Sequence, residues 1–153
     1  MTTNAKTIES ITEEMGEECI GVRVRLLNRV ITKIYDDALR PLGITTNQMS
    51  ILISMLRKGF STPSEIGNFL KMEKSTLSRN LDRMRKSGWL AILAGEDGRS
   101  QCLRMTPKGK RVVEKSWPLW RSAQKKAKKV LGECGAASVC DTADSVWAEQ
   151  SGS

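Results

Sequence analysis

Hydroxyl and guanidinium side chains cluster near the middle of the chain, between residues 75 and 84. At helical spacing they share one face, while Leu77, Leu81 and Met84 form a separate apolar face. Such donors can read base edges and hold phosphate oxygens when a helix enters the major groove of DNA. The segment therefore predicts a DNA recognition helix, with an ordinary solvated helix face as the simpler alternative. The polar members are Ser75, Thr76, Ser78, Arg79 and Arg83.

The two arginines of this segment are expected to have different roles. Arg79 lies in the first turns of the helix, where a bidentate contact to guanine is worth about 1–3 kcal/mol of discrimination. Arg83 follows one turn later and is expected to reach a phosphate or to pair with neighbours of Asp82.

A second basic feature is the sequence Asp97-Gly98-Arg99-Ser100, which lies between two strand-like segments, 90–93 and 101–105. A hairpin tip that carries an arginine can reach the minor groove, so Arg99 is a candidate DNA contact. An ordinary Asp-Gly turn with an incidental arginine is the alternative. A recognition helix followed by a basic hairpin is the order of a winged helix-turn-helix.

A helix start signal occurs at residues 62–65. Thr62 suits the N-cap, Pro63 suits the first helical position, and Glu65 completes a capping box. The backbone N–H groups at a helix start can also hold a phosphate. Thr62 and Ser64 are therefore candidate DNA contacts, although capping alone would explain Thr62.

The sequence patterns of the segments that must position these residues predict a mostly α fold with a small β-hairpin. An amphipathic helix is expected over 15–39, because apolar residues recur there at spacings of three and four. The next helix should begin after Thr45 or Thr46, and a short helix should cover 63–70. Residues 1–14 are polar and are expected to be disordered or frayed.

Two helices are expected after the hairpin. A long helix should begin at Pro107 and run to about residue 131, with a kink at Pro118. Gly132 and Gly135 should separate it from a last helix over 138–147.

The chain resembles the MarR (multiple antibiotic resistance regulator) family over residues 15–147. The most specific part is the wing Asp97-x-Arg99-Ser100, followed by the pattern Leu103-x-x-Thr106-x-x-Gly109. The resemblance implies an obligate homodimer with a winged helix-turn-helix DNA-binding lobe and a helical dimerisation domain. It also implies that Arg99 inserts into the minor groove and that Asp97 orients its guanidinium.

Under this resemblance, residues 15–40 and 107–147 are the dimerisation helices, and residues 45–106 are the winged helix-turn-helix. Residues 148–153 form a tail. Large apolar side chains of the C-terminal helices, including Trp117, Trp120 and Trp147, are candidates for the dimer interface or for the core. A twofold dimer would bind a pseudo-palindromic operator in double-stranded DNA, with half-sites about one turn apart.

Charge is distributed unevenly along the 153 residues, whose formal net charge is +8. Residues 57–129 contain nineteen Lys and Arg against six Asp and Glu, as expected of a polyanion binder. Histidine is absent, which weakens catalytic and metal-binding interpretations, so we expect neither a metal nor another cofactor. No secretory leader or membrane-length apolar run is present, so we expect a cytoplasmic protein without a membrane partner.

Three residues are candidate effector or redox groups. The resemblance implies that hydroperoxide sensors keep a reactive cysteine near Cys19 and an interacting tyrosine at the position of Tyr35. Cys19 lies two residues from the sensor position, and two residues rotate a helix by about 200°. A small buried hydrophobe is the alternative role for Cys19. Arg23 is a candidate for stabilising the thiolate or for holding the carboxylate of a ligand.

These observations predict a homodimeric, sequence-specific transcriptional regulator, a repressor relieved by a small-molecule effector. Ligand-responsive members of the resembling family bind aromatic acids or lipophilic drugs between the dimer helices and the DNA lobe. One alternative is a thiol-based redox regulator, and another is a basic architectural protein that binds nucleic acid nonspecifically. An enzyme is not expected, because the sequence offers no nucleophile with a matching base. The cysteines, Cys19, Cys102, Cys134 and Cys140, leave redox sensing open.

Overall fold

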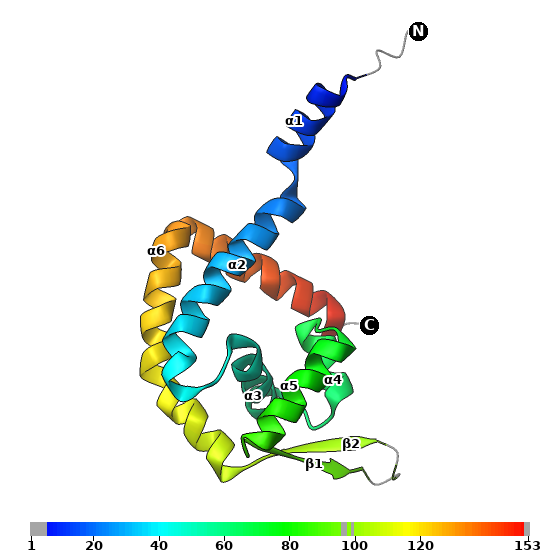
Figure 1. Ribbon diagram of the computed structural model, residues 1–153, viewed down its shortest axis with the longest axis vertical. Coiled ribbons are helices and arrows are strands. Elements are labelled where there is room, and N and C mark those ends of the chain that lie inside the picture. The colour runs from blue at the N-terminus through cyan, green and yellow to red at the C-terminus, as the bar shows by residue number, and fades with distance from the viewer. Residues whose placement is uncertain (1–5, 96–97, 99, 152–153) are drawn as a thin grey trace. The chain divides into compact units, whose positions relative to one another are not determined.

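The computed structural model describes residues 6–95, 98 and 100–151 and is mostly helical, with one two-stranded hairpin (Figure 1). The predicted fold class is therefore confirmed. The elements in chain order are α1 (Ile8–Glu18), α2 (Ile20–Leu39), a 3-10 turn (Arg40–Leu42), α3 (Thr46–Lys58), α4 (Pro63–Leu70), α5 (Lys74–Lys86), β1 (Leu90–Ala94), β2 (Gln101–Met105) and α6 (Pro107–Ser151).

The chain divides into two compact units, residues 1–33 and 34–153. In the first unit, helix α1 stands where a frayed segment was expected. Its start is stabilised because the Thr7 hydroxyl accepts a hydrogen bond from the Ser10 N–H at 3.3 Å. Cys19 has an extended backbone, so the expected single helix over 15–39 is instead two helices. No described residue of α1 is buried.

The second unit has a core formed by α3, α4, α5 and the hairpin, with the end of α2 and the start of α6 packed against it. Apolar residues at helical spacing supply this core, including the predicted inward face of α5. On α3, Met55 is buried in this core, whereas Leu56 is exposed. The side chains with almost no exposure are Leu39, Ile51, Leu52, Ile66, Met84 and Leu90.

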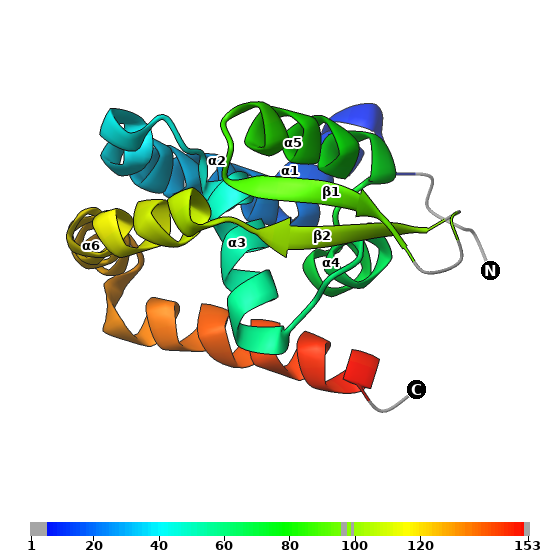
Figure 2. The same ribbon diagram turned by 90° about the horizontal axis from the view of Figure 1, so that it is seen from below.

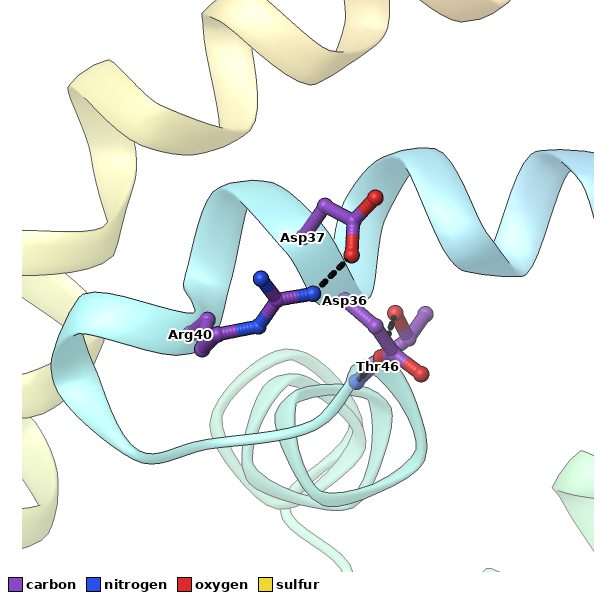
Figure 3. A network of polar contacts seen from close by, with 4 residues as sticks. All are labelled: Asp36, Asp37, Arg40 and Thr46. Carbon is purple, nitrogen blue, oxygen red and sulfur yellow. Dashed lines mark hydrogen bonds and ion pairs between the residues drawn. The ribbon is translucent and has the colours of Figure 1, made fainter.

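Side-chain caps fix the starts of α3 and α4, whereas α5 follows Glu73 without a side-chain cap. Thr45 begins α3 with a capping box that it shares with Gln48, as the sequence allowed. Figure 3 shows that Asp36, near the end of α2, lies against the first residue of α3. Its carboxylate accepts hydrogen bonds from the Thr46 N–H and hydroxyl, both at 2.6 Å. The next residue, Asp37, pairs with Arg40 of the 3-10 turn. The α2–α3 junction is therefore held by charge-assisted contacts.

The hairpin lies beside α4 and α5 (Figure 2). Its strands are antiparallel, with Leu90 opposite Met105 and Ala94 opposite Gln101. The Leu103 N–H donates to the carbonyl of Ser61 at 2.6 Å, which ties strand β2 to the residue before the α4 cap. A shift of the hairpin must therefore also move the start of α4.

The pattern Leu103-x-x-Thr106-x-x-Gly109 has a structural explanation. Leu103 is buried in the core, and the Thr106 hydroxyl donates to the Gly88 carbonyl at 2.7 Å while accepting from the Gly109 N–H at 3.0 Å. A Cβ at Gly109 would lie 2.1 Å from the Trp89 carbonyl oxygen. The pattern therefore closes the junction where α5, the hairpin and α6 meet.

Helix α6 is interrupted at Gly132, whose φ of 72° and ψ of 163° are not helical. This confirms one of the two predicted breaks, whereas Gly135 lies within the second helical half. Pro118 lies inside the first half, and its neighbours keep helical backbone angles. None of the helices in the described part of the chain is long and apolar enough to cross a membrane.

Candidate nucleic-acid interface

The outer face of α5 presents the predicted polar side chains together. Ser75, Ser78, Arg79 and Arg83 are exposed and Thr76 is half-buried, whereas Leu77, Leu81 and Met84 on the opposite side are buried. Ser75, Arg79 and Arg83 follow one another at intervals of four residues, so they form a stripe along the helix. This face can offer hydroxyl and guanidinium donors to a groove.

Arg79 is held loosely within its own helix. Its guanidinium donates to the Thr76 hydroxyl at 3.4 Å, and the Asn80 amide donates to the Thr76 carbonyl at 2.9 Å. Arg79 and Arg83 also line a cleft of about 290 Å³ with Thr45 and Asn47 at the start of α3. Sequence reasoning missed Asn47, because only the fold brings the start of α3 beside α5.

Arg83 differs from its basic neighbours on α5. Asp82 pairs with Arg85 at 2.9 Å and with Lys86 at 2.8 Å, and hydrogen bonds from Lys86 and then Arg85 lower the pKa of its carboxyl. No described residue forms an ion pair with Arg83. Its guanidinium is therefore available to a phosphate, which is one of the two roles expected from the sequence.

The start of α4 has the predicted capping box, and this changes the interpretation of Thr62. The Thr62 hydroxyl donates to the Glu65 carboxylate at 2.9 Å and accepts from the Glu65 N–H at 3.3 Å. The same carboxylate accepts the N–H groups of Ser61 and Thr62 at 3.0 and 2.9 Å. These hydrogen bonds lower the pKa of the Glu65 carboxyl, and the bond from the Ser61 N–H has the largest effect. A phosphate at this helix start would compete with Glu65, while the Ser64 side chain is exposed.

The wing residues Asp97 and Arg99 lie outside the described residues, so their predicted roles stay predictions. At the start of strand β2, Ser100 and Gln101 line a cleft of about 590 Å³ together with Thr62, Ser64 and Lys74. The fold therefore brings the start of α4, the start of α5 and strand β2 to one surface. Lys74 and Gln101 join the candidate interface without having been singled out by the sequence.

A separate cavity of about 440 Å³ lies in the second unit, between the end of α2, helix α3 and both halves of α6. Aromatic, aliphatic and hydroxyl-bearing side chains share its wall. Among the described residues, none that lines it is charged. The aromatic members are Tyr35, Trp117, Trp120 and Trp147, and the hydroxyl-bearing members, besides Tyr35, are Thr46, Ser50, Ser54 and Ser116.

The tryptophans of this cavity have partners within the chain. The Trp117 and Trp120 rings are stacked, with centroids 5.5 Å apart. Trp147 stacks on Phe69 at 5.3 Å, and its Nε1–H donates to the Phe69 carbonyl at 3.1 Å. These contacts favour the intramolecular alternative for Trp147. Trp117 stays 58% exposed.

The three effector candidates do not form one described group. Cys19 and Arg23 belong to the first unit, where the Arg23 guanidinium donates to the carbonyls of Cys19 at 3.2 Å and Gly16 at 3.4 Å. Tyr35 belongs to the second unit, where its hydroxyl donates to Gln124. Burial and, to a smaller extent, nearby Cys140 raise the pKa of Tyr35. All four cysteines are free thiols. Among the described residues, no three His, Cys, Asp or Glu side chains cluster as a metal site would require.

Comparison with known proteins places this geometry in a family. A model of the MarR family matches residues 42–100. The multiple antibiotic resistance protein MarR of Salmonella typhimurium is 30% identical over 96 residues, which are 62% of this chain and 67% of that protein. The Mycobacterium tuberculosis regulator MosR, solved in complex with DNA, is 32% identical with a TM-score of 0.71, over 86% of this chain and 98% of that one.

The chain belongs to the MarR family. MarR-family proteins are transcriptional regulators built on a winged helix, and they are not enzymes. A further relative, the uncharacterized regulator YwoH of Bacillus subtilis, is 30% identical over 86 residues, or 56% of this chain and 63% of YwoH. The chain therefore spans less than two thirds of YwoH, and the residues that the family model matches, 42–100, are those from the end of the 3-10 turn to the residue before β2.

Proposed function

We propose that this MarR-family regulator is a homodimeric, sequence-specific repressor of transcription that binds a pseudo-palindromic operator. The observation that carries the proposal is the outer face of α5, where Ser75, Arg79 and Arg83 form an exposed stripe opposite the buried apolar face. Ser78 and Thr76 flank the stripe, and the hairpin that follows α5 carries Arg99 at its tip. Hydroxyls and unpaired arginines suit base edges, whereas nonspecific binding requires only positive charge.

Dimerisation would cover the apolar side chains that α2 leaves exposed. Ile20, Val24 and Leu27 recur at the spacing of a helix-packing stripe and are 75%, 57% and 40% exposed. Such a stripe in contact with water suits an obligate interface between two copies. Because the target is chromosomal DNA, the site of action would be the cytoplasm.

Effector control would act through the cavity lined by Tyr35 and the three tryptophans. An occupant there contacts the end of α2, helix α3 and both halves of α6 at once. Its binding can therefore shift the balance between arrangements of these elements that differ in DNA affinity. The wall carries no charge, so the cavity suits a planar, largely apolar molecule of about the size of a drug fragment.

The experiment that tests the proposal is a titration of DNA from upstream of the protein's own gene against a shuffled fragment. Specific binding predicts a large affinity ratio that Arg79→Ala reduces, while Arg85→Ala serves as the control because Arg85 already pairs with Asp82. Equal binding of both fragments, weakening together as salt rises, would support the nonspecific alternative instead. Repeating the titration with and without reductant separates cysteine-based control from ligand control.

A further inference from the structure

Helix α1 is an acidic amphipathic helix without a buried face. It contains five glutamates and no basic residue, and its apolar side chains, Ile8, Ile11 and Met15, are 66%, 37% and 66% exposed. At 100° per residue these three form one narrow stripe, and Glu14 and Glu18 border it on the side of Ile11. The helix therefore presents an apolar stripe with a negative edge that no described residue of its own unit covers.

A complementary surface lies on the first half of α6. Residues 115–132 contain six basic side chains and no acidic one. Arg121, Lys125 and Lys128 lie on the same outer face as Trp117, and the Arg121 guanidinium lies 5.8 Å from the centre of the Trp117 ring. In the part of the chain that the structure describes, none of the lysines from 125 to 129 forms an ion pair. We call this surface the basic face of α6.

The basic face is directed away from the candidate DNA interface. Lys125 is eighteen residues into α6, which corresponds to about 27 Å from the base of the hairpin. Figure 1 shows that the first half of α6 leads away from β1 and β2, toward the bend. A single DNA duplex held by α5 and the wing is therefore a poor occupant for these lysines.

We infer that α1 of one protomer docks on the basic face of α6 of a second copy, with Glu14 and Glu18 set against the lysines. This inference rests on the proposed homodimer and adds a contact whose opposite charges fix how the two protomers are aligned. An acidic stripe meeting a basic stripe specifies partner and orientation more than it adds affinity. The apolar stripe of α1 would cover part of the Trp117 ring, which is exposed on the same face as these basic side chains.

The test is a charge swap in the full chain, read as the dissociation constant of the dimer from dilution of fluorescently labelled subunits. Glu14→Lys with Glu18→Lys is expected to weaken the dimer about ten-fold at low salt, and less at high salt. Lys125→Glu with Lys128→Glu, on the basic face of α6, should weaken it similarly. Combining all four changes in one chain should restore the wild-type value. Glu13→Lys with Glu17→Lys is the matched control, because these glutamates lie on the opposite side of α1 from the apolar stripe.

Three results would overturn the inference. The control could weaken the dimer as much as Glu14→Lys with Glu18→Lys, or the four-residue swap could fail to restore it. The lysine variant could also lower DNA affinity while leaving the dimer unchanged, which would assign the basic face to DNA. A wild-type chain that is monomeric at micromolar concentration would instead overturn the proposed dimer itself.

Discussion

At the scale of single residues, the candidate interface depends on which charged side chains are already paired within α5. Asp82 pairs with Arg85 and Lys86, so the basic side chains of α5 that remain available to DNA are Lys74, Arg79 and Arg83. The sequence predicted the polar face, since helical periodicity is local. It did not predict the partners of Asp82, because several basic residues lie within one turn of it.

Replacing Arg79 by alanine is expected to lower operator affinity about 5- to 150-fold, because one good bidentate contact is worth about 1–3 kcal/mol. The loss should be smaller on a nonspecific fragment, so the ratio between the two fragments should fall. Fluorescence anisotropy with both fragments checks this. If affinity falls by the same factor on both, Arg79 contacts phosphate and not a base.

Replacing Gly109 by alanine is expected to destabilise the fold by about 2 kcal/mol or more, because the new Cβ would lie 2.1 Å from a backbone oxygen. Urea unfolding of the two proteins measures the difference. Gly16→Ala is the control, since a Cβ there meets nothing within 4 Å. A loss of less than about 0.5 kcal/mol at Gly109 would show that the junction relaxes without cost.

The carboxylate of Glu65, which caps the start of α4, makes the stability of the fold depend on pH. Hydrogen bonds from Ser61 and Thr62 lower the folded pKa of Glu65, so its stabilising contribution is complete above the ordinary glutamate value of about 4.3. The contribution is lost as the pH falls through the folded pKa. The free energies of unfolding of the wild type and of Glu65→Gln should therefore differ at pH 7 and become equal in more acidic solution. A gap that stays constant down to pH 3 would contradict the assignment.

At the scale of elements, the helix starts were predictable and the docking of the last helix was not. Thr62, Pro63 and Glu65 lie within four residues, so their signal survives in a single sequence. The contact of Trp147 with Phe69 joins residues 78 positions apart. No local pattern encodes such a contact. The sequence therefore could not decide whether Trp147 packs in a dimer interface or in the core.

Replacing Trp147 by alanine is expected to cost about 2 kcal/mol, because it removes a stacked ring and a hydrogen bond at a partly exposed site. It should also open the wall of the cavity and weaken the binding of apolar probes there. Urea unfolding and probe titration measure the two effects. Val146→Ala, at a neighbouring exposed position, should change stability by less than about 0.5 kcal/mol. Equal losses for both variants would show that the second half of α6 is not held by Trp147.

At the scale of the whole molecule, the uneven charge predicted a polyanion partner but not where each basic residue would lie. The fold separates two basic surfaces, the outer face of α5 and the basic face of α6, which composition alone could not distinguish. The family resemblance carried by residues 75–109 was the stronger signal. It identified a MarR-family regulator, and the family comparisons confirmed this.

The proposed dimer predicts a dependence on operator spacing. Two lobes related by a twofold axis bind half-sites about one helical turn apart, so inserting five base pairs between the half-sites turns them to opposite faces. We expect affinity to fall at least about ten-fold on such a fragment. Gel shifts with the native and lengthened operators measure the effect, and a shuffled fragment sets the baseline. Unchanged affinity would mean that each half-site is bound independently.

The residues that line the cavity are spread along the chain from Tyr35 to Trp147, and this affects the order in which parts of the protein can fold during synthesis. The core of the winged part is complete at Val112, whereas the cavity is not complete until Trp147 has been added. During synthesis the recognition helix can therefore be folded before the cavity wall is present. A stop codon between residues 133 and 147 would produce a chain that keeps the recognition helix but lacks Trp147, the last lining residue to be synthesised. Where such a truncated chain still dimerises, the allele should bind the operator and respond less to inducer.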